Sequence, residues 1–395
     1  MKITSVDVML ITLGEPSNIG TPWNPVVVRI NTDEGISGYG EMGLTYGKAK
    51  DAAYGMAQDF GRLILGMDPM NSEQIWEKQF RQTFWGQGGG GVVFSAMSAI
   101  DIALWDLKGK ALGVPVYQLL GGKTNKKLRA YASQIQFDWG KHCHHLIQPA
   151  EYAEATRKAI ADGYDCVKVD PVGYDEFGNW KQLKTTGLIG RKHMRLAVDR
   201  VAAIREAGGP DMDIIIELHA LTDAVSAVQF AREVEQFGIY YYEEPTTPMN
   251  AGNMKYVADK TNIPIASGER IYGRYAYQKF FEDHSLQVIQ PDLGNTGGIS
   301  EGKKICDMAS AYDVAVQMHV CGGPLATAAA IQLEAVIPNF LIHEQHAAAL
   351  LEKNIRSCKY DYQPVNGYFE VPDRPGIGNE LSEEAIETAI ITTLK

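Results

Sequence analysis

The sequence lacks any segment that would place it in a membrane. None of the apolar runs among its 395 residues approaches the roughly 20 residues that a membrane helix requires. The first 16 residues alternate in polarity and include Asp7, which predicts a folded β-strand and not a signal peptide. We therefore expect no membrane partner.

The sequence also contains few cysteines and fewer basic than acidic residues. The five cysteines are an odd number and form no Cys-x-x-Cys pair, a pattern typical of a reduced, cytoplasmic protein. Lys and Arg number 37 against 48 Asp and Glu, so the formal net charge is −11. This charge would repel a phosphate backbone, and no basic stripe with interleaved aromatics is present, so we expect no nucleic-acid partner. An anionic small molecule remains possible where a metal ion supplies local positive charge.

The first third of the chain predicts a small α+β domain. Residues 3–11, 25–33 and 35–43 form three β-like runs, with a turn between the last two at Asp33 to Gly35. From about residue 48 to residue 112 the apolar residues recur at helical spacing, and Gly113 ends the pattern. Since 395 residues exceed the usual size of one hydrophobic core, we expect this domain to cap a larger one.

The larger domain is predicted to be a parallel β/α barrel. Eight short apolar runs, each followed by a helical stretch, are the strand candidates: 128–133, 165–170, 213–218, 239–243, 264–267, 287–291, 314–319 and 340–343. The predicted fold class is thus α/β, a modified (β/α) TIM-like barrel with an α+β N-terminal capping domain. We expect the cap over residues 1–125, the barrel over 126–360, and a tail over 361–395 that packs back on the cap and is helical at 381–392.

Ionisable residues stand at the carboxyl ends of most predicted strands, where a barrel gathers them at one mouth. Glu217, Glu243 and Glu269 each follow an apolar strand, in steps of 26 residues. Three buried anions side by side repel one another unless a cation lies among them. All-oxygen ligands favour Mg²⁺, with Mn²⁺ also accepted, so the sequence predicts a divalent-metal site.

Two histidines accompany these acids. Asp292 and His319 end adjacent strands, so the carboxylate is expected to orient the imidazole as a general base. His219 lies two residues beyond Glu217, and strand alternation would turn both side chains to the same side. His219 is a candidate for protonating a leaving hydroxyl; the alternative is that it only orients Glu217.

The combination of these residues resembles a known family. The stretch SAIDIALWDLKGKALGVPVYQLLGG, the glutamates within ELH, EEP and GER, the VIQPD and QMH segments, and HE at 343–344 are similar to the mandelate racemase subgroup of the enolase superfamily. Members remove the proton α to a substrate carboxylate and stabilise the resulting enediolate with the metal. The resemblance implies that Glu344 donates a hydrogen bond to this anion and is therefore protonated, as burial beside other acids would favour.

Within the subgroup, Glu-x-His at 217–219 resembles the galactonate and mannonate dehydratases, where the histidine assists loss of the β-hydroxyl. Racemases usually carry Lys-x-Lys on the second strand, whereas this chain has Lys168 followed two residues later by Asp170. We therefore predict a Mg²⁺-dependent dehydratase of a hexonate, pentonate or aldarate that yields a 2-keto-3-deoxy acid. The alternatives are a racemase or epimerase with Lys168 as second base, and a non-catalytic binding or regulatory barrel.

The resemblance also implies that cap loops close over the mouth and select the substrate. Trp23, Tyr46 and Trp85 are the candidates for contact with the polyol, the alternative being ordinary loop packing, and Asp170 is a further candidate for substrate binding. Mannonate dehydratases place a Tyr–Arg pair near the second strand, in the region of Tyr174. Relatives are often oligomers, so a homo-oligomer is expected.

Overall fold

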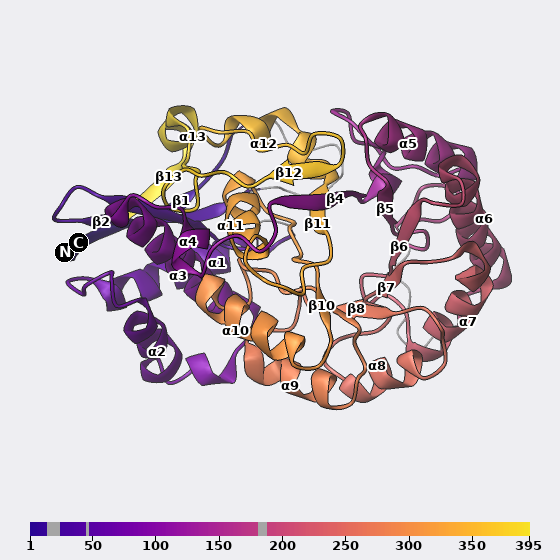
Figure 1. Cartoon of the computed structure of the whole chain (residues 1–395), viewed down its shortest axis with the longest axis horizontal. Helices are drawn as coiled ribbons and strands as arrows, with labels where there is room; N and C mark the ends of the chain where they lie inside the picture. The colour runs from indigo at the N-terminus through magenta and orange to yellow at the C-terminus, as the bar shows by residue number, and fades with distance from the viewer. Residues whose placement is uncertain (14–23, 45–46, 181–187) are drawn as a thin grey trace.

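The computed structural model of the chain describes residues 1–13, 24–44, 47–180 and 188–395. Two units lie side by side, with the amino-terminal strands and helices at the left of Figure 1 and the barrel at the right. Both chain ends lie on the first unit (Figure 1). Among the described helices, none combines the length and apolar character needed to cross a bilayer.

The capping domain is built on an antiparallel sheet that contains the three predicted strands. Its strand order is β13-β1-β2-β3, formed by Ile390–Leu394, Ile3–Leu10, Val26–Thr32 and Ser37–Glu41. The prediction of a helix over 381–392 is wrong in its second half, because α13 (Glu383–Thr388) ends early and the chain continues as β13. The run Ile-Ile-Thr-Thr is β-branched and favours a strand once the edge of β1 is available for pairing.

Helices cover one face of this sheet, as the periodicity predicts: α1 (Lys50–Ile64), α2 (Ser72–Gln82) and α3 (Gly91–Leu112). Helix α3 is buried on most sides because it lies between the sheet and the barrel. It approaches β3 so closely that a Cβ at Gly40 would lie 1.9 Å from the carbonyl oxygen of Ala99. Glycine is thus required at this contact.

The barrel has the eight parallel strands expected from the sequence. In chain order they are β4 (Lys127–Ser133), β5 (Cys166–Val169), β6 (Asp213–Glu217), β7 (Tyr241–Glu243), β8 (Ile265–Ser267), β9 (Val288–Ile289), β10 (Ala315–Val316) and β11 (His343–His346). Each strand from β4 to β9 pairs with the next in sequence, and β11 pairs with β4. A bridge from Val316 to Phe340, just before β11, closes the ring. The predicted fold class is confirmed.

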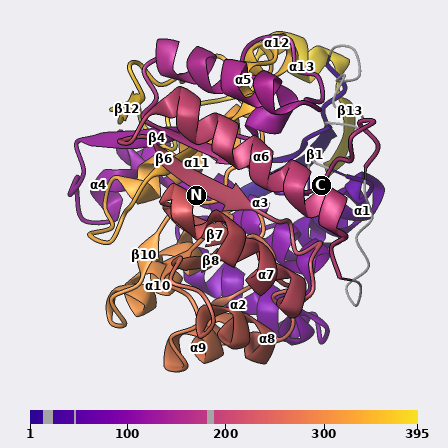
Figure 2. The same ribbon diagram turned by 90° about the vertical axis from the view of Figure 1, so that its right-hand side faces the viewer.

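Seven helices alternate with these strands: α5 (Pro149–Ala161), α6 (Arg191–Gly208), α7 (Ala224–Val234), α8 (Ala251–Ala258), α9 (Arg274–Glu282), α10 (Gly298–Ser310) and α11 (Pro324–Glu334). Figure 2 shows α6 and α7 crossing the outer face of the barrel that is turned toward the viewer. The shorter elements are α4 (Val116–Leu119), α12 (Glu352–Arg356) and β12 (Tyr368–Glu370), which pairs antiparallel with β4.

Buried polar side chains from the cap join it to the barrel. Asp101 of α3 accepts hydrogen bonds from the backbone N–H of Ser300, at 2.9 Å, and from its hydroxyl, at 2.6 Å. Glu41 at the end of β3 accepts from the N–H groups of Gly323, at 2.5 Å, and Ala326, at 3.3 Å. These donors belong to the first turns of α10 and α11, where backbone N–H groups have no partner within their own helix. The cap therefore completes the amino ends of two barrel helices. The boundaries at 125 and 360 stay predictions.

Candidate active site

Three glutamates converge at the carboxyl ends of β6, β7 and β8. Glu217 and Glu243 are direct neighbours in the parallel register, and Glu269 lies two residues beyond β8. One ligand oxygen from each lies within 4.8 Å of the others, so the structure brings together the three predicted ligands in a group that can hold a metal ion. We call Glu217, Glu243 and Glu269 the triad.

The triad contains buried carboxylate oxygens that no hydrogen bond satisfies. Oε2 of Glu217 and Oε2 of Glu243 are both buried and have no hydrogen-bond partner. A buried carboxylate oxygen without a partner is costly, and burial together with the charge of Glu217 raises the pKa of Glu243 well above its ordinary value. A divalent cation would satisfy both oxygens, so these residues fit the metal that the sequence predicts.

Lys168 lies beneath the triad as a fixed positive charge. Its Nζ is 2.7 Å from Oε1 of Glu243, 2.8 Å from Oε1 of Glu344 and 3.6 Å from Oε2 of Glu217. Burial opposes the charge, but these carboxylates prevail and raise the pKa of Lys168 well above its ordinary value. A lysine held in this way is a poor base.

Glu344 differs from the expectation. We predicted that burial would keep it protonated, yet Lys168 and the charge of His319 outweigh burial and hold the pKa of Glu344 well below its usual range. Its oxygens also accept hydrogen bonds from the Ser133 hydroxyl, at 2.6 Å, and from the Val320 N–H, at 2.9 Å. The sequence could not show this, because Lys168 reaches Glu344 across the barrel interior.

The predicted pair of Asp292 and His319 is present. Asp292 Oδ2 lies 2.7 Å from Nδ1 of His319, which leaves the other ring nitrogen for the mouth. That nitrogen, Nε2, is 3.0 Å from Oε2 of Glu269. Against the effect of burial, Glu269 and Asp292 raise the pKa of His319 well above its ordinary value. The imidazole is thus oriented and lies beside the triad.

His219 reaches the site by a route that strand alternation did not predict. Strand β6 ends at Glu217, and His219 and Ala220 have left-handed backbones with φ of 49° and 53°. This turn lets the N–H of His219 donate to Oε1 of Glu217 at 2.6 Å. Burial opposes the imidazolium, but Glu217 and the bond to Asp170 raise the pKa of His219 to about 10.

Asp170 is used within the protein and is not presented to a substrate as we expected. It is 1% exposed, and its Oδ2 lies 2.8 Å from Nδ1 of His219. Gln136 and Gln134, which the sequence analysis missed, complete this side of the mouth. Gln136 Oε1 accepts from the Asp170 N–H at 3.1 Å, and Gln134 Nε2 is 3.4 Å from Nε2 of His219. Gln134 directly follows β4, so a strand-end search that included uncharged polar residues would have found it.

The cap-loop candidates are only partly placed. Trp23 and Tyr46 lie outside the described residues. Trp85 is 75% exposed, and its ring packs edge-on against Phe84 at 5.0 Å. The cap does reach the mouth at Gly43, whose N–H donates to Gly294, two residues past Asp292, at 2.9 Å. Contact of these aromatic residues with a substrate stays a prediction.

Tyr174 is buried in an aromatic cluster beside β5. Its ring lies 4.4 Å from that of His145 and 5.1 Å from that of Trp180. The backbone carbonyl of Tyr174 accepts from Nη1 of Arg200 at 2.7 Å.

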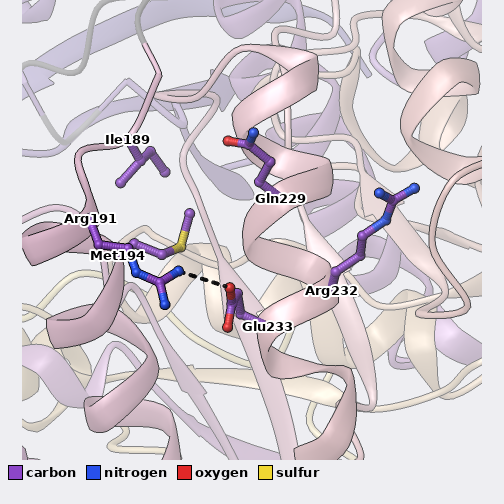
Figure 3. A pocket seen from close by; sticks show the side chains of 6 residues that line it. All are labelled: Ile189, Arg191, Met194, Gln229, Arg232 and Glu233. Atoms are coloured by element: carbon purple, nitrogen blue, oxygen red, sulfur yellow. Dashed lines mark ion pairs between the residues drawn. The ribbon is translucent and has the colours of Figure 1, made fainter.

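A pocket of about 370 Å³ lies away from this site, on the outside of the barrel (Figure 3). It is lined by residues of α6 and α7 and of the segment before α6: Ile189, Arg191, Met194, Gln229, Arg232 and Glu233. Figure 3 shows Arg191 facing Glu233 across it, with a closest approach of 3.6 Å. None of the predicted site residues lines this pocket.

Comparison with known proteins gives one consistent result. Residues 21–121 match the model of the mandelate racemase / muconate lactonizing enzyme N-terminal domain, and residues 151–385 match that of the enolase C-terminal domain-like family. D-galactonate dehydratases from Pectobacterium atrosepticum and Variovorax paradoxus are 35% and 34% identical over 91% of this chain and 89% of theirs. A crystal structure of an enolase superfamily member from Salmonella Typhimurium superposes with a TM-score of 0.97 at 56% identity, covering 100% of both chains.

Proposed function

This chain belongs to the mandelate racemase and muconate lactonizing enzyme family of the enolase superfamily, and we propose that it removes water from a sugar-acid carboxylate. Its curated relatives named above are dehydratases, which confirms the prediction of a carbon–oxygen lyase. The D-galactonate on which those relatives act makes a hexonate the first substrate to consider. Pentonates and aldarates present the same α-hydrogen, carboxylate and β-hydroxyl and belong to the same proposal.

We assign Mg²⁺ to the triad, with Mn²⁺ as a substitute. Its three ligands are carboxylates, which suit a hard cation, whereas Zn²⁺ favours nitrogen and sulfur. The cation would supply positive charge to the substrate carboxylate and would offset the charge of Glu269, which otherwise holds the pKa of His319 high.

The first half of the proposed reaction belongs to His319. Nε2 of His319 takes the proton from the α-carbon, and the C–H electron pair enters the carboxylate to form an enediolate. Asp292 holds Nδ1 of the ring at 2.7 Å, so Nε2 is the nitrogen that receives the proton. The donor role of Glu344 that the resemblance implies stays a prediction, and in the structure its carboxylate lies 2.8 Å from Nζ of Lys168 and accepts from the Val320 N–H.

The second half belongs to His219. The electron pair of the enediolate forms a carbon–carbon double bond, the C–O bond at the β-carbon breaks, and the leaving oxygen takes a proton from the imidazolium of His219. Water departs, and the enol that remains tautomerises to a 2-keto-3-deoxy acid. His219 follows β6 and His319 follows β10, four strands apart in a ring of eight, so one imidazole is available on each side of the triad.

The observation that carries the proposal is the pairing of each of these imidazoles with a carboxylate on either side of the triad. Racemisation would need a second base, and Lys168 is tied to Glu243 and Glu344 as an ammonium group. A non-catalytic barrel would have no use for buried glutamate oxygens without hydrogen-bond partners.

A panel of hexonates, pentonates and aldarates with Mg²⁺ tests the proposal, with 2-keto acid formation as the readout. We expect turnover of at least one acid sugar and none after chelation of the metal. Deuterium exchange at the α-carbon without 2-keto acid would select the racemase or epimerase. Absence of both, together with no thermal stabilisation by Mg²⁺, would select the binding barrel.

Two further expectations accompany the proposal. All five cysteines are free thiols, which supports the reduced, cytoplasmic setting. Assembly into a homo-oligomer stays a prediction.

A further inference from the structure

Both oxygens of the Asp170 carboxylate are fully used. Oδ2 lies 2.8 Å from Nδ1 of His219, and Oδ1 accepts hydrogen bonds from the N–H groups of Val172, at 3.0 Å, and Gly173, at 2.9 Å. A Cβ at Gly173 would lie 2.8 Å from Oδ2 of Asp170 and 2.8 Å from a ring carbon of Trp180, so the loop closes on the carboxylate with no room for a side chain. The carboxylate is thereby held in a single orientation.

Arg200 of α6 holds the loop that follows Asp170 in place. Its side chain is buried, and Nη1 donates to the carbonyl oxygens of Pro171, at 2.8 Å, and Tyr174, at 2.7 Å. Nη2 donates to the carbonyl oxygen of Ile147 at 2.8 Å. A buried guanidinium that donates to backbone carbonyls binds the segment rigidly, because each lost bond would leave a buried charge without an acceptor. The chain of contacts therefore runs from α6 through the loop and Asp170 to His219.

His219 needs such an anchor because its own backbone does not supply one. It lies beyond the end of β6 in a left-handed turn, and its side chain is 30% exposed. When Nδ1–H of an imidazole is bound to a carboxylate, the tautomer is set and Nε2 is left for the reaction. The contact has the same form as the 2.7 Å contact between Asp292 and His319 across the triad.

We propose that Asp170 is a positioning residue for His219, serving the elimination half of the reaction as Asp292 serves proton abstraction. The inference rests on the proposed function. His319 removes the α-proton without help from Asp170. Breakage of the β-carbon–oxygen bond needs Nε2–H of His219 aimed at the leaving oxygen. Asp170 accepts a hydrogen bond from Nδ1–H of the same ring throughout. After Nε2 has given up its proton, the ring is therefore neutral and in a single tautomer.

Asp170→Asn and Asp170→Ala, with Mg²⁺ present, separate the two halves. We expect kcat for dehydration to fall by about 100-fold, because general acid catalysis contributes a factor of roughly that size. KM should change by less than about threefold. Deuterium from solvent should appear at the α-carbon of recovered substrate, because abstraction by His319 continues without being followed by elimination. Asp170→Glu should restore part of kcat, and Asp292→Asn should lose exchange and dehydration together.

Asp175→Asn is the matched control. Asp175 lies in the same loop, is buried, and its Oδ1 accepts from the N–H groups of Phe177 and Asn179 at 2.9 Å. It accepts from backbone N–H groups as Asp170 does, whereas the imidazole of His219 is bound by Asp170. We expect its ratio of exchange to dehydration to equal that of the wild type. Thermal stabilisation by Mg²⁺ should be retained in every Asp170 and Asp175 variant.

The imidazole ¹⁵N signals of His219 test whether Asp170 sets its tautomer, even if no acid sugar is turned over. In ¹⁵N-histidine-labelled protein with Mg²⁺, at a pH where the ring is neutral, His219 should show a protonated Nδ1 that becomes a mixture of tautomers in Asp170→Ala. The signal is assigned by its loss in His219→Gln. An unchanged signal would overturn the positioning role while leaving the proposed function intact. Equal loss of exchange and dehydration in Asp170→Asn would also overturn it, as would a kcat within threefold of the wild type.

Discussion

The buried acids at the junction of cap and barrel differ from the buried acids at the barrel mouth. Both carboxylate oxygens of Asp101 accept hydrogen bonds from Ser300. By contrast, Glu217 and Glu243 each keep one buried oxygen without a hydrogen-bond partner. Buried carboxylates thus join the cap to the barrel at the junction, whereas at the barrel mouth they favour the binding of a cation.

The difference in hydrogen bonding separates buried acids that hold the fold from buried acids that can bind a ligand. An acid that receives backbone donors at a helix amino end stabilises the fold. An acid that faces other acids with oxygens unpaired stores repulsion, which only a ligand of opposite charge relieves. Substitutions in the two places should therefore separate stability from activity.

Removal of the base should give the largest effect and no loss of stability. In His319→Asn the imidazole that faces the mouth is gone, so we expect kcat to fall by at least about 10³-fold. Deuterium exchange at the α-carbon should disappear with it, and the Tm should stay within a few degrees of the wild type. An activity within tenfold of the wild type would remove His319 from the mechanism.

Neutralising one triad member should lower turnover but should not weaken the folded protein in the absence of metal. In Glu243→Gln the repulsion from Glu217 is relieved, so the free energy of unfolding without Mg²⁺ should equal or exceed that of the wild type. The increase in Tm on addition of Mg²⁺ should vanish. Thermal unfolding without Mg²⁺ and with Mg²⁺ at roughly a hundred times its dissociation constant measures both. A large loss of stability without metal would place Glu243 with the interface acids.

The interface variant should show the reverse pattern. Asp101→Ala leaves the buried N–H and hydroxyl of Ser300 without their acceptor, which costs about 1–3 kcal/mol. Urea unfolding should record this loss, while kcat per folded molecule and the response to Mg²⁺ stay near those of the wild type. Unchanged stability would show that the cap does not depend on this bond.

The smallest expected effect is a pH dependence at the same residue. Burial raises the pKa of Asp101 from 3.8 to about 7, so between these values the folded protein holds a proton that the unfolded chain has released. The free energy of unfolding should therefore fall as the pH rises through this window. Asp101→Asn removes the titrating group, and its stability should vary less with pH over this range. Equal slopes in the two proteins would refute the assignment.

The sequence was sufficient for the fold and for the residues that end neighbouring strands. Spacing alone brought the triad together and paired Asp292 with His319, because parallel strands deliver their ends to one mouth. The same logic applies to Asp170 and His219, which follow the ends of β5 and β6, but the expectation of strand alternation concealed it, since His219 lies in a left-handed turn.

Two features depend on contacts that spacing does not encode. The ionised state of Glu344 depends on Lys168, which reaches it through the barrel interior. The final strand β13 forms because β1 offers a free edge, whereas the local pattern of its preceding residues favours a helix. In both cases tertiary contacts outweigh the local signal.

The most direct test of the account is a count of Mn²⁺ ions bound by the triad, measured by electron paramagnetic resonance during titration. We predict one site per chain in the wild type, displaced by Mg²⁺, and its loss in Glu217→Gln and Glu243→Gln but not in Asp101→Asn. Retention of the ion in both triad variants, or its absence from the wild type, would contradict the claim that these acids are held together for a cation.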